Sequence, residues 1–286
     1  MKQKLKQSAD NHFIPMTSIG AGKVKELAAD VCYYTNQIVN VVFVGLPGSD
    51  GWVLIDAGMP GSAKKILSVA QDRFGDKKPA AIFLTHGHFD HVGGIVPLIE
   101  EWKVPVYAHP VEFPFLSGQL NYPEPDNTVE GGMLAKLSSI YPHQATDISP
   151  ALKPLPEDGT LPGLPGWAWM HTPGHSPGHV SFFRRSDRLL VAGDAFVTVR
   201  ADSLYKVLIQ RKEVNGPPRY LTTDWKAAEH SVFNLLALQP ETAVTGHGAA
   251  MEGAKLREGL LLLADRFKQL AVPGYGKFVS KNGWTL

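Results

Sequence analysis

The stretch "THGHFDHVGG" (residues 85–94) places three histidines and one aspartate within six positions, directly after the apolar run "PAAIFL". A short apolar run of this kind is typical of a strand that is buried on both faces. Residues i and i+2 of an extended segment project to the same side, so His86 and His88 can bind one metal ion. Asp90 and His91, one turn further on, can face a second ion. The stretch therefore predicts a metal site at the end of a buried strand.

The composition of the chain limits the classes of function. Its 286 residues are 44% hydrophobic and 19% charged, which is ordinary for a globular protein with a large core. The formal net charge is +1, so neither nucleic acid nor an acidic membrane surface is an expected partner. Cys32 is the only cysteine, which excludes an intrachain disulfide and makes histidine and carboxylate the expected metal ligands.

The N-terminal segment "MKQKLKQSADNHFIP" carries lysines but no apolar stretch behind them, so we expect no signal peptide. No apolar run approaches the roughly 18 residues of a membrane helix. We therefore expect a cytoplasmic protein that acts on a small molecule, with no membrane or nucleic-acid partner. The sequence leaves the oligomeric state open.

Strand and helix patterns alternate along the chain without an obvious linker. They predict a mixed α/β protein with a single domain over residues 1–286. The expected elements are a hairpin over 37–58, a helix over 62–75, strands over 80–85 and 104–109, two consecutive strands over 179–196, a helix over 224–240, a strand over 241–245 and a closing helix over 254–271.

Three further polar residues follow apolar runs later in the chain. His175 comes after "WAWMHTPG", Asp194 after "LLVAG" and His247 after "ETAVTG". Imidazole nitrogens suit zinc, iron or copper, and a carboxylate can span two ions held about 3.5–4 Å apart. The strand ends therefore predict a site with more than one metal ion.

These motifs together resemble the metallo-β-lactamase superfamily of metal-dependent hydrolases. The resemblance runs in the family's order through "LIDAG", "THGHFDHVGG", "TPGHSPGH", "VAGDAF" and "VTGHGA". It implies an α/β fold of the αββα sandwich type, with two mixed β-sheets flanked by helices. It also implies two Zn²⁺ per chain, with iron or manganese as the alternatives, and a hydroxide that bridges them.

The same resemblance implies a ligand set. Two groups of three residues would each hold one ion, Asp194 would bridge the two ions, and Asp56 would support the site through hydrogen bonds. The first group is His86, His88 and His175, and the second is Asp90, His91 and His247.

The run "HTPGHSPGH" (171–179) offers three histidines, and spacing alone does not choose between them. The family pattern selects His175, which follows the Pro-Gly turn, and makes His179 a supporting hydrogen-bonding residue and His171 a strand residue. Four other histidines match no motif: His12, His109, His143 and His230.

Details of the motifs narrow the range of reactions that we expect. Asp194 stands where true β-lactamases carry a cysteine or a serine, and this resembles the glyoxalase II and lactonase branch. We expect a hydrolase for a small ester, lactone or thioester, with Asp90 or Asp194 moving the proton to the leaving group. A glyoxalase II-like thioesterase and a mononuclear iron oxidoreductase of the persulfide dioxygenase type remain the alternatives. Residues 110–150 and 196–222, rich in aromatics, are expected to set specificity.

Overall fold

The computed structural model describes residues 4–279. These residues form two compact units, each built on one mixed β-sheet. Unit 1 comprises residues 4–123 and 142–165, and unit 2 comprises residues 124–141 and 166–279. The single domain expected over residues 1–286 stays a prediction. Among the described residues, no helix is both long and apolar enough to cross a membrane.

Unit 1 contains a seven-stranded sheet whose strands lie in sequence order. Neighbouring strands from β1 to β4 are antiparallel, and those from β4 to β7 are parallel. The strands are β1 (Val24–Ala28), β2 (Val31–Asn36), β3 (Val39–Val44), β4 (Val53–Ile55), β5 (Ala81–Phe83), β6 (Val106–Ala108) and β7 (Leu152–Pro154).

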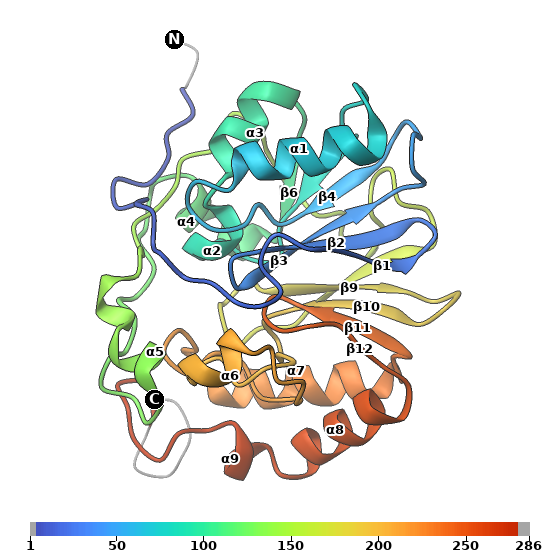
Figure 1. Cartoon of the computed structure of the whole chain (residues 1–286). Coiled ribbons are helices and arrows are strands. Elements are labelled where there is room, and N and C mark those ends of the chain that lie inside the picture. The colour runs from blue at the N-terminus through green and yellow to red at the C-terminus, as the bar shows by residue number, and fades with distance from the viewer. Residues whose placement is uncertain (1–3, 280–286) are drawn as a thin grey trace. The chain divides into compact units, whose positions relative to one another are not determined.

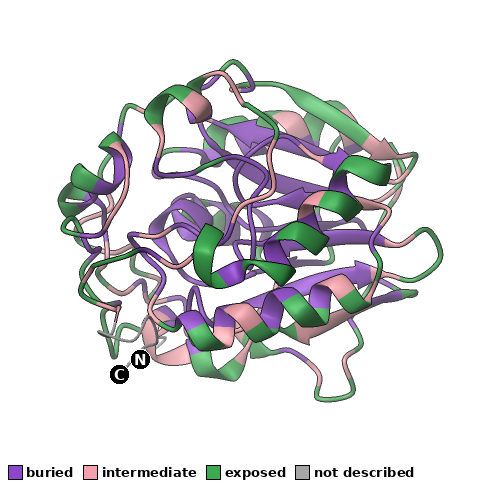
Figure 2. Cartoon of the chain, turned by 90° about the horizontal axis from the view of Figure 1, so that it is seen from below, coloured by how far each residue is buried: buried purple, intermediate pink, exposed green. Residues whose placement is uncertain are grey.

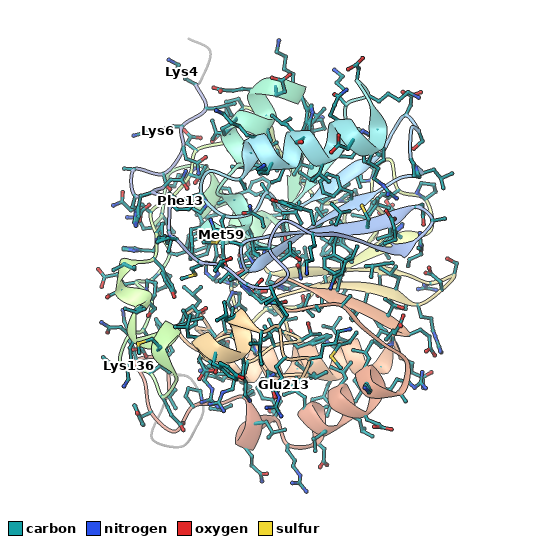
Figure 3. The ribbon with its side chains drawn as sticks, in the orientation of Figure 1. Lys4, Lys6, Phe13, Met59, Lys136 and Glu213 are labelled. Carbon is teal, nitrogen blue, oxygen red and sulfur yellow. The ribbon has the colours of Figure 1, made fainter. Side chains whose placement is uncertain are left out.

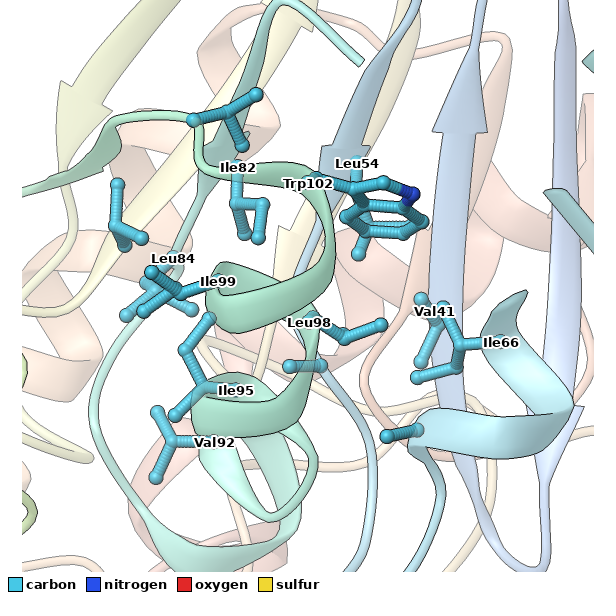
Figure 4. Packing of buried hydrophobic residues seen from close by; sticks show 14 of the residues in the cluster. Val41, Leu54, Ile66, Ile82, Leu84, Val92, Ile95, Leu98, Ile99 and Trp102 are labelled. Carbon is cyan, nitrogen blue, oxygen red and sulfur yellow. The ribbon is translucent and has the colours of Figure 1, made fainter. Parts of the chain in front are cut away.

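Two helices, α1 (Ala63–Phe74) and α3 (Ile95–Trp102), pack on the seven-stranded sheet (Figure 1). Figure 4 shows α3 directing Leu98 and Trp102 toward the strands, in one core cluster with Leu54 of β4. Each such side chain contributes about 1.5–3 kcal/mol through burial of apolar surface. This packing fixes the end of β5, from which the "THGHFDH" segment emerges.

Unit 2 contains a five-stranded sheet in the order β12-β11-β10-β9-β8. β10 and β11 are parallel, and the other neighbouring pairs are antiparallel. The strands are β8 (Trp167–His171), β9 (Val180–Arg184), β10 (Leu189–Gly193), β11 (Thr242–Thr245) and β12 (Met251–Glu252).

Helices α7 (Trp225–Ala237) and α8 (Gly253–Asp265) cover the sheet of unit 2 (Figure 1). α7 begins where Asp224 accepts a hydrogen bond from the backbone N–H of Ala227 at 2.9 Å, as a helix N-cap does. Both helices carry a buried stripe and an exposed stripe, a pattern that Figure 2 shows as alternating colours along the helices.

The remaining helical segments of the described residues are short. In unit 1 they are α2 (Phe89–Val92), the 3₁₀ turn η1 (Pro110–Glu112) and α4 (Phe113–Leu116). In unit 2 they are α5 (Met133–Lys136), the 3₁₀ turn η2 (Ser138–Ile140), α6 (Leu204–Leu208) and α9 (Phe267–Leu270). Lys4 and Lys6 of the N-terminal segment and Lys136 of α5 are exposed (Figure 3).

Most of the elements expected from sequence are present, and one prediction was wrong. The closing helix expected over 254–271 is interrupted at Arg266, which has the non-helical dihedral angles φ −123° and ψ 33° and separates α8 from α9. Apolar periodicity continues across this break because Phe267 is also buried against the unit 2 core, so the pattern did not reveal it.

Candidate metal centre

The four ligand-type residues of "THGHFDH" form one cluster in unit 1. His86 and His88 lie on the extended segment after β5, and Asp90 and His91 lie in α2. The His86 ring centroid lies 4.6 Å from that of His88 and 4.2 Å from that of His91. All four side chains are buried, with at most 5% of their surface exposed. We call these four residues the unit 1 cluster.

Donor atoms within the unit 1 cluster approach one another closely enough to share metal ions. One ligand atom of His86 and one of His88 lie within 4.8 Å of each other, as do one of Asp90 and one of His91. The extended backbone before α2 explains the first pair, since i and i+2 side chains point to the same side. The first turn of α2 explains the second pair.

Asp56, just after β4, holds this cluster in place. Its carboxylate accepts hydrogen bonds from the Thr85 N–H, the Thr85 hydroxyl and His91 Nδ1, each at 2.8 Å. Because a carboxylate can only accept, Nδ1 of His91 carries the proton and Nε2 is the ring nitrogen that suits a metal. Asp56 has φ 64°, a left-handed conformation that aspartate tolerates better than most residues.

A close backbone approach brings Asp56 and His91 together. The N–H of Ala57 donates to the carbonyl of His91 at 2.7 Å, and the N–H of Gly93 donates to the carbonyl of Gly58 at 2.8 Å. A Cβ at Gly93 would lie only 2.2 Å from the carbonyl carbon of Met59, the buried residue labelled in Figure 3. The glycines of "HVGG" therefore allow the carboxylate to reach the imidazole.

Sequence reasoning missed one feature of unit 1, a buried Glu112–Tyr122 pair beside Gly87. The Gly87 N–H donates to Glu112 Oε2 and to the Tyr122 hydroxyl oxygen, both at 3.0 Å, and the hydroxyl donates to Glu112. Burial and the neighbouring Glu112 carboxylate raise the pKa of Tyr122 well above its usual value, so the phenol stays protonated. From sequence, these two residues belong only to the aromatic-rich 110–150 segment that is expected to set specificity.

The second cluster lies in unit 2 and consists of His175, Asp194 and His247. His175 Nε2 and His247 Nε2 each lie 3.4 Å from Asp194 Oδ2, and none of the three side chains is more than 3% exposed. Within the sheet, β8, β10 and β11 run in the same direction, so their carboxyl ends meet at one edge. We call these three residues the unit 2 cluster.

The structure separates the roles of the three histidines of "HTPGHSPGH". His179 Nε2 accepts a hydrogen bond from the Asp194 backbone N–H at 2.9 Å, and its Nδ1 lies 2.9 Å from the Thr172 hydroxyl. Both ring nitrogens of His179 are thus engaged, and Nε2 holds the backbone at Asp194. His171 is exposed and lies 2.9 Å from the Pro177 carbonyl through its Nε2. His175 Nε2 lies 3.4 Å from the Asp194 carboxylate.

Thr222 is a second feature that sequence reasoning missed. Its hydroxyl donates to the Pro218 carbonyl at 2.8 Å, and its oxygen lies 3.2 Å from His175 Nδ1. Because the hydroxyl proton is used on Pro218, the threonine oxygen accepts from His175 Nδ1–H, which leaves Nε2 as the nitrogen that suits a metal. A threonine in a proline-rich loop gives no signal of this role in the sequence.

The four histidines without a motif have local contacts. His12 Nδ1 lies 2.7 Å from the Asp10 carbonyl, and His143 Nδ1 lies 3.9 Å from Asp10 Oδ2. His230 Nδ1 lies 2.9 Å from the Lys226 carbonyl, and His109 Nδ1 accepts from the backbone N–H of Val111 in η1. The structure places none of these four among the residues of either cluster.

The donor set of the two clusters fits a metal of the first transition row. Imidazole nitrogens and carboxylate oxygens suit zinc, iron or manganese, and the orienting hydrogen bonds of His91 and His175 are typical of metal-binding histidines. Thiolate makes no contribution, because Cys32 is buried in β2 and desolvation raises its pKa to about 12.

A family model described as the metallo-β-lactamase superfamily matches residues 34–247. The chain belongs to the metallo-β-lactamase superfamily. A relative in Bacillus subtilis (strain 168), described as probable metallo-hydrolase YflN, is 46% identical over 260 residues, which cover 90% of this chain and 98% of the relative. The expectation of a metallo-hydrolase is therefore confirmed at the level of the family.

Two solved structures extend this comparison. TTHA1623 in a di-iron-bound form has 30% identity and a TM-score of 0.50, over 79% of this chain and 92% of that chain. MEM-A1, a subclass B3 metallo-β-lactamase from a soil metagenome library, has 20% identity and a TM-score of 0.55, over 79% and 80% of the two chains. The metallo-β-lactamase fold, with two mixed sheets flanked by helices, is confirmed.

Proposed function

We propose that the chain is a dinuclear metal-dependent hydrolase for a small ester, lactone or thioester. The unit 1 and unit 2 clusters together would hold two ions, each with three ligands, and Asp194 would bridge them. His86, His88 and His175 would hold the first ion, and Asp90, His91 and His247 the second. The observation that carries the proposal is the unit 2 cluster, where one carboxylate oxygen lies 3.4 Å from two imidazoles.

Two bound metal ions would lower the pKa of a shared water to near neutrality and so supply a hydroxide nucleophile at cellular pH. The chain's own residues would orient the ligands and move the proton. Asp56 and Thr222 fix the tautomers of two ligand histidines, and His179 fixes the backbone at Asp194. Asp90 or Asp194 would accept the proton and pass it to the leaving group.

Aspartate at position 194 supports the choice of substrate class. A carboxylate at this position resembles the glyoxalase II and lactonase branch of the superfamily, whereas β-lactamases carry cysteine or serine there. The formal net charge of +1 favours a small molecule over a nucleic acid or a membrane surface. We also propose a cytoplasmic location, in keeping with the single cysteine.

Zinc is the proposed metal, with iron or manganese as alternatives. A di-iron-bound relative at 30% identity makes iron the first alternative to test. A mononuclear iron oxidoreductase of the persulfide dioxygenase type would need only one ion. Asp90 and His91 are both buried beside each other in unit 1, which favours the dinuclear hydrolase.

The test combines metal analysis with a substrate screen. The purified chain is quantified for zinc, iron and manganese and is then assayed against lactones, aryl esters, thioesters, phosphodiesters and β-lactams. We expect two metals per chain and a kcat/KM for lactones or aryl esters at least about tenfold above that for phosphodiesters and β-lactams, about 1.4 kcal/mol of transition-state preference.

One iron per chain with oxygen consumption would establish the oxidoreductase instead. A protein that holds two metals and cleaves only phosphodiesters would contradict the proposed substrate class but would still support the dinuclear centre.

A further inference from the structure

The segment between His86 and His88 consists of one glycine, and the structure shows why. A Cβ at Gly87 would lie 2.6 Å from the Tyr122 hydroxyl and 3.0 Å from Leu116 Cδ2. Glycine is also the residue with the greatest backbone freedom. Without a further restraint, backbone rotation at Gly87 would therefore leave the relative orientation of His86 and His88 poorly defined.

The Glu112–Tyr122 pair supplies such a restraint. The Gly87 N–H is held by two acceptors at 3.0 Å, and the Tyr122 ring lies 4.5 Å from the His88 ring, in an edge contact between ring centroids. Glu112 is fully buried and Tyr122 is 5% exposed. Phe115 stacks on Tyr122, with centroids 4.1 Å apart and ring planes 13° apart.

Burying a carboxylate is costly unless it is hydrogen-bonded, and unsatisfied buried acceptors cost about 1–3 kcal/mol or more. Simple packing of the loop would be served by apolar residues at these positions at lower cost. The pair instead provides three effects. It fixes the backbone at Gly87 through hydrogen bonds, and the Tyr122 ring restrains the orientation of the His88 ring. The Glu112 carboxylate also adds a buried negative charge near the imidazoles of His86 and His88. These three effects act on the same ligands.

We propose that Glu112 and Tyr122 are positioning residues that set the metal affinity of the His86–His88 half of the centre. They act through the backbone of Gly87 and the ring of His88 and do not bind the metal themselves. The inference rests on the proposed function only in taking His86 and His88 as metal ligands. It does not depend on the substrate.

The test measures metal binding without turnover. Metal-free protein is titrated with Zn²⁺ against a competing chelator, and the thermal unfolding of the metal-free protein is recorded in parallel. Tyr122→Phe should weaken one zinc-binding step by about tenfold or more, within the 10–100-fold range typical of residues that support metal ligands. Tyr34→Phe is the matched control, because Tyr34 is also 5% exposed and lies in the unit 1 core. It should change affinity by less than about twofold.

Glu112→Gln separates charge from shape. The amide oxygen keeps an acceptor near the Gly87 N–H, while the negative charge is lost, so a weaker zinc affinity in this variant assigns part of the effect to charge. Glu112→Ala should weaken zinc binding further. If Glu112→Ala fails to fold, the Tyr122→Phe and Glu112→Gln titrations still decide the question.

A double-mutant cycle distinguishes positioning from general stability. In a His88→Ala background, Tyr122→Phe should lose most of its effect on zinc affinity, because the ligand through which it acts is gone. An equal effect with and without His88 would overturn the inference, and so would a Tyr122→Phe affinity equal to that of Tyr34→Phe. Unchanged zinc binding in His88→Ala would overturn both this inference and the ligand assignment. A protein that binds zinc but hydrolyses none of the substrates would overturn only the proposed reaction.

Discussion

The unit 1 and unit 2 clusters reach similar chemistry by different routes. In unit 1, four ligand-type residues stand within six positions and are brought together by one strand end and one helical turn. In unit 2, three residues come from the ends of β8, β10 and β11 and are brought together by the order and direction of the strands. The first cluster is a local property of the chain, whereas the second exists only once the sheet has formed.

Both clusters also depend on supporting residues that are distant in the chain. The unit 1 cluster depends on groups that are distant in the chain, namely Asp56 and the Glu112–Tyr122 pair. The unit 2 cluster depends on His179, from the same Pro-Gly segment as His175, and on Thr222 from the loop before α7. A local ligand motif still needs tertiary support, because adjacent residues on a turn are not held rigidly by their own backbone.

The largest effect should come from the residue between the two imidazoles of unit 2. Asp194→Ala should reduce kcat/KM by at least about 10³-fold, roughly 4 kcal/mol of transition-state stabilisation, and lower metal content below one ion per chain. The fold should survive, since the core of unit 2 lies in its apolar cluster. Metal analysis, kinetics and circular dichroism check these points. Full activity with two retained metals would contradict the assignment of Asp194 as the bridge.

The next largest effect should distinguish the ligand His175 from the supporting residue His179 in the same segment. His175→Ala should weaken one metal-binding step by more than about 100-fold, whereas His179→Ala should weaken it by about 10–100-fold. The exposed His171→Ala is the matched control and should leave metal affinity unchanged. Chelator competition gives the three values. Metal loss at His171 together with none at His175 would show that the ligand is the other histidine.

A comparable effect is expected in unit 1 when the support of His91 is changed. Asp56→Asn keeps a residue that tolerates the left-handed conformation, but its amide replaces one of the carboxylate oxygens that accept from Thr85 and His91. We expect metal affinity to fall by about 10–100-fold and the metal-free protein to lose about 1–3 kcal/mol of stability. Titration and denaturant unfolding measure both quantities. A loss of stability without any loss of affinity would make Asp56 a structural residue only.

The smallest effect should come from Thr222. Thr222→Val keeps the shape of the side chain but removes the oxygen beside His175 Nδ1, so metal affinity should fall by roughly 3–10-fold, at or below the lower end for such supports. Thr223→Val, at the neighbouring half-buried position, is the control. Equal affinities in the two variants would show that Thr222 does not set the tautomer of His175.

Much of this architecture could be predicted from the sequence, because its signals are local. Apolar periodicity predicted α1 and α7, and the strand pattern over 37–58 predicted the hairpin of β3 and β4. The same signal failed at Arg266, where burial of Phe267 continues the apolar pattern across a break in the backbone. Periodicity reports which residues are buried and does not report whether the helix is continuous.

The sequence by itself determined which residue types are available for metal chemistry and where the unit 1 cluster lies, since spacing along one extended segment fixes which side chains share a face. Tertiary structure alone decided that His179 supports the backbone at Asp194, that Thr222 faces His175, and that a buried Glu112–Tyr122 pair holds Gly87. These contacts join positions far apart in the chain, or depend on which ring nitrogen faces which group. Neither property leaves a pattern in the order of the residues, because the pairing arises only when loops pack against a completed sheet.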